Sequence, residues 1–199
     1  MLPTDTYQAL LVALTAAYLL GSFPTAVLVS RLRGVDIFSA GPGLAGATNV
    51  FRQVGPVEGI VVLLVDAAKG ALAIGVAYRL GLSGDLLLLP ALASVFGHWR
   101  PIFTRFRGGD GVATLVGITF ALFPLYVLPS FAVAFVVGSL ARLTGKPVPT
   151  LWGGVAGYGL LFLRLPASQE SAPMVIGVVL LAMMVLAHGV IGHRRRRAA

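Results

Sequence analysis

The chain has 199 residues, of which 57% are hydrophobic and only 11% are charged, and its mean hydropathy is +0.92. This charge content is too low to cover the surface of a soluble domain, so the composition indicates an integral membrane protein. The net charge of +8 is therefore interpreted as orienting helices and meeting anionic lipid rather than nucleic acid. The absence of cysteine excludes disulfides and thiolate catalysis.

The apolar segments are long and do not alternate with period two, which predicts an all-α membrane protein with about seven transmembrane helices. In chain order, we expect spans over 7–30, 58–80, 85–99, 112–127, 128–142, 149–165 and 174–191. Kinks or breaks are expected at Pro24, Pro90, Pro124 and Pro129. No linker or internal repeat divides the sequence, so residues 1–199 are expected to form a single transmembrane domain.

The basic residues predict the orientation of the spans. With the N-terminus outside, only two basic residues, Arg79 and Arg164, lie in or near the outer loops. The inner loops then hold twelve, namely Arg31, Arg33, Arg52, Arg100, Arg105, Arg107, Arg142, Lys146 and Arg194 to Arg197. The positive-inside rule therefore places the N-terminus outside and the C-terminus in the cytoplasm, with both glycine-rich loops on the cytoplasmic face.

The first glycine-rich loop runs from Gly41 to Arg52 between two strongly apolar segments. Glycines allow a backbone to fold tightly and to direct several N–H groups at one point, where an anion is the natural ligand. Arg52 adds a fork of donors, and Thr48 and Asn49 add side-chain donors. The simpler alternative is an interfacial turn in which Arg52 anchors lipid phosphates.

Two charged residues, Asp66 and Lys69, lie three positions apart within the second span and hence on one helix face. Charges inside a membrane helix are normally paired or face a polar cavity. An internal ion pair that joins helices is the first interpretation, and a direct role with substrate is the second.

The second glycine-rich loop, from Arg105 to Thr114, precedes a helix that we expect to begin near Val112. Free N–H groups at a helix N-terminus favour phosphate. Asp110 does not, because a carboxylate caps a helix but repels an anion. From the residues alone, this loop is a capped helix start first and an anion site second.

The histidines are expected to be structural hydrogen-bonding residues at the interface, with His98 ending the third span and His188 near the end of the last. They show no ligand spacing with a carboxylate, so no metal site is predicted. His193 and the run from Arg194 to Arg197 are typical of a basic tail on anionic lipid.

Several motifs together resemble the bacterial acyl-phosphate:glycerol-3-phosphate acyltransferase family. They are Gly21-Ser22-Phe23-Pro24, Gly34-Val35-Asp36-Ile37, Gly43 with Gly46 to Arg52, Asp66-Ala67-Ala68-Lys69-Gly70, Gly97-His98, and Arg107-Gly108-Gly109 with Gly111 to Thr114. Their order and spacing agree through about residue 120, and beyond that the similarity is thin until His188.

This resemblance implies a multi-pass bacterial membrane enzyme of phospholipid biosynthesis whose active face is cytoplasmic. It would transfer a fatty acyl group from acyl phosphate to glycerol 3-phosphate, giving lysophosphatidate, without metal, cofactor or covalent acyl-enzyme. By this match Arg52 and His188 are the candidate catalytic residues. The candidate phosphate-binding and substrate-binding residues are Gly43, Gly46, Thr48, Asn49, Arg107, Gly108, Gly109 and Thr114.

The sequence departs from the family pattern at four positions. The family has serine, asparagine and lysine where Pro42, Leu44 and Asp110 stand, and asparagine where Ile191 stands. An alternative function is therefore a catalytically inactive or re-specialised relative that binds lipid or a second membrane acyltransferase. A small transporter, suggested only by the charges within the second span, is a weaker third hypothesis.

Overall fold

The computed structural model describes residues 4–146, 148–164 and 171–197, with side chains up to Ile191. The side chains of the predicted basic tail, His193 and Arg194 to Arg197, lie outside this described part. Helices are the only regular elements in the described ranges: α1 (Thr4–Ser22), α2 (Thr25–Leu32), α3 (Ala47–Gln53), α4 (Pro56–Arg79), η1 (Gly84–Leu87), α5 (Leu88–Trp99), η2 (Ile102–Thr104), α6 (Val112–Leu122), α7 (Pro124–Leu143), α8 (Pro149–Arg164) and α9 (Ala172–Arg197). The predicted all-α class is confirmed.

Five described segments are long and apolar enough to cross a membrane. They are Thr4–Leu32, Pro56–Arg79, Gly84–Thr104, Pro124–Leu143 and Ala172–Ile191, while α6 is a shorter apolar helix. Large apolar side chains such as Leu125, Leu143 and Leu163 are more than three-quarters exposed on the outside of the bundle. An apolar exterior of this kind suits a hydrocarbon solvent and not water.

Prolines set two helix boundaries. The first predicted span, 7–30, is divided into α1 and α2 at Phe23 and Pro24, since proline lacks the N–H that would continue the helix. The boundary predicted between residues 127 and 128 is wrong. It lies at Phe123, because Pro124 begins α7, whereas Pro129 is accommodated inside that helix.

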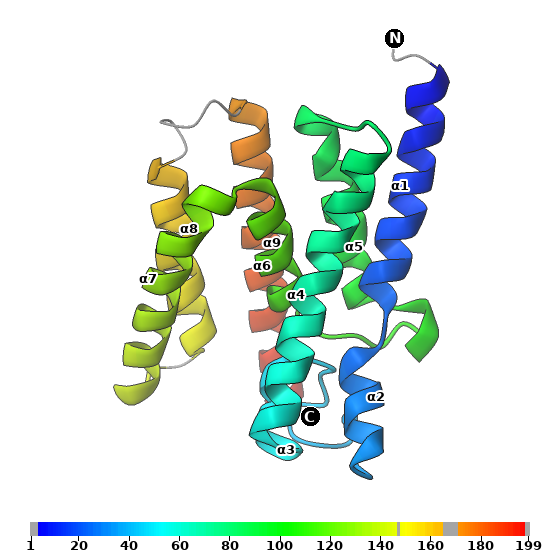
Figure 1. The fold of residues 1–199 in the computed structure, drawn as a ribbon. Coiled ribbons are helices and arrows are strands. Elements are labelled where there is room, and N and C mark those ends of the chain that lie inside the picture. The colour runs from blue at the N-terminus through cyan, green and yellow to red at the C-terminus, as the bar shows by residue number, and fades with distance from the viewer. Residues whose placement is uncertain (1–3, 147, 165–170, 198–199) are drawn as a thin grey trace.

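Small residues allow three helix pairs to pack closely. In Figure 1, α7 and α8 lie side by side at one edge of the bundle and α1 lies at the other, with α4, α5, α6 and α9 between them. A methyl group on Gly97 would meet the backbone of Tyr18 in α1, and one on Gly117 would meet the carbonyl of Ala67 in α4. Close backbone approach through small residues is the usual way that membrane helices associate.

Both glycine-rich loops and α3 lie at the end of the bundle where α5 and α9 finish (Figure 1). The main core, by contrast, is formed in the middle of the helices by apolar side chains such as Ile74, Leu115, Ile118 and Val178. The packed helices therefore form a scaffold that carries the loops at one end.

We expect Gly117→Val to destabilise the protein, because the new side chain would collide with the α4 backbone. Overpacking of this kind costs about 1–3 kcal/mol. The melting temperature of the detergent-solubilised protein measures this loss. Gly75→Ala is the matched control, since no atom lies within 4 Å of a methyl group added there. Equal melting temperatures for Gly117→Val and the unmodified protein would contradict the close approach of α4 and α6.

Candidate active site

Asn49 organises the first glycine-rich loop from its position in α3. Its side chain is 4% exposed, and Nδ2 donates to the carbonyls of Ile37 at 3.3 Å, Ala40 at 3.1 Å and Leu44 at 3.0 Å. Buried carbonyls require donors, and the two N–H groups of this one amide are shared among these three carbonyls. The amide nitrogen is thus engaged within the loop, and its predicted contact with phosphate stays a prediction.

The two glycine-rich loops contact each other through their backbones. The N–H of Ala45 donates to the Gly108 carbonyl at 3.3 Å, and the N–H of Gly109 donates to the His98 carbonyl at 3.2 Å. A methyl group on Gly108 would meet the His98 carbonyl, and one on Gly109 would meet the Ala45 carbonyl. Glycine is therefore required here because neighbouring backbones leave no room for a side chain.

Trp99 holds the rest of the second loop. Its Nε1 donates to the Asp110 carbonyl at 2.8 Å, and its ring stacks on His188 of α9 with centroids 4.5 Å apart. The end of α5 thus positions both the loop and the last helix. Gly111, which follows Asp110, has φ 85° and leads directly into α6. The helix therefore begins at Val112, as predicted.

A cavity of about 140 Å³ lies between these elements. The first loop, α3, α4, the start of α6, the start of α8 and the end of α9 all contribute to its wall. The polar side chains on the wall are Thr48, Asn49, Arg52, Asp66, His98, Asp110 and Thr150. Segments distant in sequence therefore converge on one polar cavity at one end of the bundle.

The charges on this wall have both signs. Arg52 and the first turn of α6, through Gly111, Val112 and Ala113, offer positive charge and N–H donors to an anion. The carboxylates of Asp66 and Asp110 lie on the same wall. The cavity can hold an anion against Arg52 and α6 while presenting acceptors to hydroxyl groups elsewhere.

Only some of the predicted site residues line this cavity, namely Gly46, Thr48, Asn49 and Arg52. Gly43 does not line it, and Gly108 and Gly109 instead line a smaller cavity of about 20 Å³. Arg107 lies over the ring of Phe38, 4.3 Å from its centroid, and Thr114 shares a 3.3 Å hydrogen bond with His98 Nδ1. His188 is adjacent through its stacking on Trp99, while its neighbour Gly189 lines the cavity.

Sequence reasoning did not place Asp66 and His98 at the site. Asp66 was interpreted first as half of an ion pair and His98 as a structural histidine, and both interactions are present. Both residues also line the cavity. The indication available in the sequence was their occurrence in apolar helices near the end that carries the glycine-rich loops.

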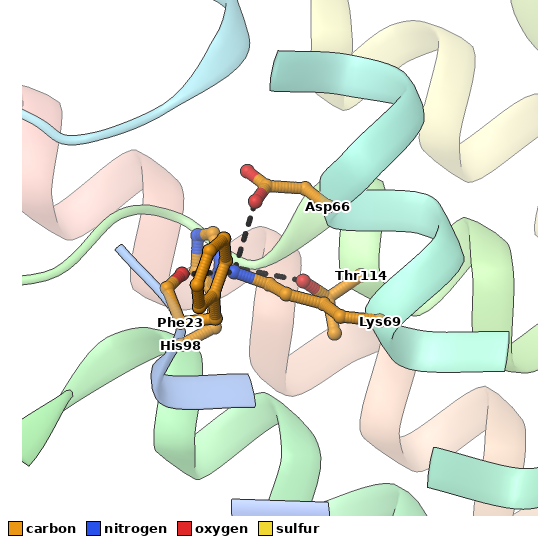
Figure 2. Close-up of polar contacts among 5 residues, drawn as sticks. All are labelled: Phe23, Asp66, Lys69, His98 and Thr114. Atoms are coloured by element: carbon orange, nitrogen blue, oxygen red, sulfur yellow. Dashed lines mark hydrogen bonds and ion pairs between the residues drawn. The ribbon is translucent and has the colours of Figure 1, made fainter. Parts of the chain in front are cut away.

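Figure 2 shows a buried polar cluster, of which Asp66 and His98 line the cavity. Lys69 Nζ lies 2.9 Å from Asp66 Oδ1 and donates to the Phe23 carbonyl at 3.2 Å. The Phe23 carbonyl belongs to the break between α1 and α2, and His98 joins α5 to Thr114 of α6. The predicted ion pair is confirmed, and the cluster holds four helical segments together at this level.

An apolar cavity of about 210 Å³ adjoins the polar one, between α6, α7, α8 and α9. The two cavities share four wall residues, Val112, Thr150, Val185 and Leu186. The apolar wall also contains glycines of α7 and α8, and Tyr158 and Thr119 share a 2.9 Å hydrogen bond on it. A ligand with a polar head and a long apolar chain would match this pair of cavities.

A sequence model described as "Glycerol-3-phosphate acyltransferase" matches residues 11–196. The chain belongs to this family. The match includes both glycine-rich loops, the ion pair of α4 and most of α9, so all elements that form the polar cavity lie within it.

Curated relatives agree with this assignment. A glycerol-3-phosphate acyltransferase of Trichlorobacter lovleyi is 35% identical over 173 residues, covering 87% of this chain and 86% of the relative. One of Thermus thermophilus is 44% identical over 147 residues, covering 74% and 73%.

Solved structures show the same fold. The crystal structure of PlsY (YgiH), an integral membrane glycerol 3-phosphate acyltransferase in its glycerol 3-phosphate form, gives a TM-score of 0.75 at 33% identity, covering 94% of this chain and 88% of that one. Its lysophosphatidic acid form gives a TM-score of 0.72 at 31% identity, with coverages of 90% and 87%. The present chain is accordingly an integral membrane protein.

We expect Asn49→Ala to loosen the first loop, because the buried carbonyls of Ile37 and Leu44 and the partly buried carbonyl of Ala40 lose the amide that they share. Each unsatisfied buried group costs about 1–3 kcal/mol. Faster tryptic cleavage after Arg52 in the solubilised protein measures the effect. Thr48→Ala is the control, since Thr48 is exposed on the same helical turn. An unchanged cleavage rate in Asn49→Ala would show that the loop does not depend on this amide.

Proposed function

We propose that this protein is a membrane acyltransferase of phospholipid biosynthesis, which transfers a fatty acyl group from acyl phosphate to glycerol 3-phosphate. The observation that carries the proposal is the polar cavity, because the elements around it are those that the family match includes. The structural similarity to an acyltransferase in its glycerol 3-phosphate form supports the same substrate.

The proposed reaction needs position and charge more than a reactive side chain. The acceptor hydroxyl oxygen attacks the acyl carbonyl carbon, the bond from that carbon to the phosphate oxygen breaks, and phosphate leaves with the electron pair. The hydroxyl proton passes to the released phosphate or to water. Because acyl phosphate is already activated, alignment of the reactants and stabilisation of the leaving phosphate supply the catalysis.

Arg52 and the start of α6 are the elements that would hold the phosphate of the donor. The adjoining apolar cavity would receive its acyl chain, since the shared wall residues let one molecule occupy both spaces. Thr48 would donate to phosphate from the exposed turn of α3. His188, fixed by Trp99, would orient the acceptor from the side of α9.

The proposed topology has seven spans, an outer N-terminus and a cytoplasmic C-terminus and active face. The spans expected from the sequence correspond to α1 with α2, then α4, α5, α6, α7, α8 and α9. The distribution of Lys and Arg over the connecting segments supports this orientation. The cavity then opens where glycerol 3-phosphate is dissolved, while the acyl donor lies in the bilayer.

Asp110 favours one specific alternative, an inactive or re-specialised relative that binds lipid or a second acyltransferase. Its carboxylate lines the cavity where the family pattern has a lysine. The deciding experiment is acyl transfer from palmitoyl phosphate to labelled glycerol 3-phosphate by the purified, lipid-reconstituted chain. Lysophosphatidate formation supports the proposed function. Its absence, in the unmodified protein and in Asp110→Lys alike, supports the alternative.

Arg52→Ala is expected to lower the rate of transfer by about 100-fold, because removal of a donor that stabilises developing charge has an effect of this size. Steady-state formation of lysophosphatidate measures it. Arg105→Ala is the matched control: Arg105 is also an exposed arginine of a glycine-rich loop, but it does not line the cavity. Equal rates for Arg52→Ala and Arg105→Ala would remove Arg52 from the site.

Asp110→Lys is expected to lower the KM for glycerol 3-phosphate by about 10-fold or more. A unit charge at ~4 Å is worth roughly 4 kcal/mol at an effective dielectric constant of ~20, before screening by salt. The effect should shrink as ionic strength rises, which a salt series of KM measures. Asp85→Asn is the control, because Asp85 lies in η1, before the opposite end of α5. A KM that rises in Asp110→Lys would contradict an anionic acceptor beside this position.

A further inference from the structure

The ion pair between Asp66 and Lys69 is built asymmetrically. The two side chains are 2% and 6% exposed, and both lie on α4 within a membrane-spanning segment. Lys69 has two partners, Asp66 Oδ1 and the Phe23 carbonyl. Asp66 has only one in the described part of the chain, and Figure 2 shows its second oxygen pointing away from Lys69.

The two charges also face different spaces. Asp66 lines the polar cavity of about 140 Å³, and Lys69 does not. Both line a second, smaller cavity of about 20 Å³, between the break of α1 and α2 and the second glycine-rich loop with Arg107. The ion pair therefore lies across the wall of the polar cavity. The Asp66 carboxylate is on the side of the cavity, and the Lys69 ammonium is on the side away from it.

An ion pair that only joins helices does not need one of its members to line a cavity. A buried charge pair contributes little net stability, because desolvation offsets most of the attraction. A carboxylate held at a cavity wall, however, accepts hydrogen bonds from hydroxyl groups, and charge-assisted bonds of this kind are the stronger ones. Lys69 offsets the negative charge of Asp66, so a phosphate held by Arg52 in the same cavity is repelled less.

The geometry points to Asp66 as the residue that binds the hydroxyl groups of the acceptor, with Lys69 as the residue that positions it. This inference rests on the proposed function and extends it: the ligand of this subsite is the polyol part of a glycerol-type acceptor. Asp110, the other carboxylate on the wall, lies beside Gly189 of α9 and is a separate position. The Asp66 subsite contributes hydroxyl recognition, while phosphate recognition belongs to Arg52 and α6.

The test measures two quantities on the purified full-length protein. The first is equilibrium binding of labelled glycerol 3-phosphate without donor, and the second is transfer from palmitoyl phosphate with the KM of each substrate. The principal variant is Asp66→Asn with Lys69→Met, because removing both charges leaves no buried charge unpaired. Asp66→Glu is a second variant that keeps the pair and moves the carboxylate. Asp85→Asn is the control outside the cavity.

The double variant is expected to keep the unmodified melting temperature within a few degrees and to bind glycerol 3-phosphate about 10- to 100-fold more weakly, as loss of a charge-assisted hydrogen bond predicts. The KM for palmitoyl phosphate should stay within about twofold, since Arg52 and α6 hold its phosphate and removal of one charge of each sign leaves the net charge of the pair unchanged. Asp66→Glu should weaken acceptor binding while remaining folded. Asp85→Asn should change neither quantity.

The two proposals fail in different ways. Unchanged acceptor binding in the double variant, or in a folded Asp66→Glu variant if the double variant does not fold, overturns the role of Asp66 whether or not transfer occurs. Failure of the unmodified protein to bind glycerol 3-phosphate overturns it as well. Binding that depends on Asp66 without any transfer keeps the subsite and overturns the acyltransferase function.

Discussion

The backbone contact between the two glycine-rich loops is the constraint on which the site depends. Gly108 and Gly109 lie so close to His98 and Ala45 that no side chain fits between them. The bond from the Gly109 N–H to the His98 carbonyl fixes the second loop to the end of α5. The bond from the Ala45 N–H to the Gly108 carbonyl fixes the first loop to the second loop. The start of α6 and the turn that carries Arg52 are thereby brought to one cavity, although they are separated by about sixty residues of sequence. Glycine is required here for lack of space, and the position of Arg52 beside the start of α6 on one cavity wall is its consequence.

The charged side chains inside the bundle also depend on contacts between segments that are distant in sequence. A lysine and an aspartate within an apolar helix are tolerated because each has a defined environment: Lys69 contacts a carbonyl that the break at Pro24 makes accessible, and Asp66 faces a polar cavity. The helix break, the ion pair and His98 therefore lie together around one small cavity beside the polar one (Figure 2). The carbonyl of His98 accepts the N–H of Gly109, which joins this group of residues to the second loop.

Much of the fold was predictable from local patterns. The start of α6 at Val112 followed from the glycines before it, and the break at Pro24 followed from the chemistry of proline. The division between α6 and α7 was misplaced, since two prolines five residues apart, with apolar residues on both sides, give no local reason to choose Pro124 over Pro129.

The site was less predictable, because its side chains act across long sequence distances. Arg52 and Thr48, which line the cavity, were predicted from the glycine-rich loop as donors to an anion and then again from the resemblance to the family. That Asn49 turns inward to three carbonyls, and that Gly109 uses its N–H on His98, depends on how the loops pack, which no spacing reveals. Asp66 carried an indication of its own, a charge in an apolar span, but the side of the ion pair that faces the cavity is a tertiary property.

The apolar cavity bears on how an acyl chain and an acceptor would bind to the protein. It lies between the closely packed pair α7 and α8 on one side and α6 and α9 on the other, and its wall joins that of the polar cavity. Under the proposed function, a lipid-borne chain would occupy the apolar cavity while a water-borne acceptor occupied the polar one. Because the two cavities share wall residues and are otherwise separate, both ligands would be bound at the same time.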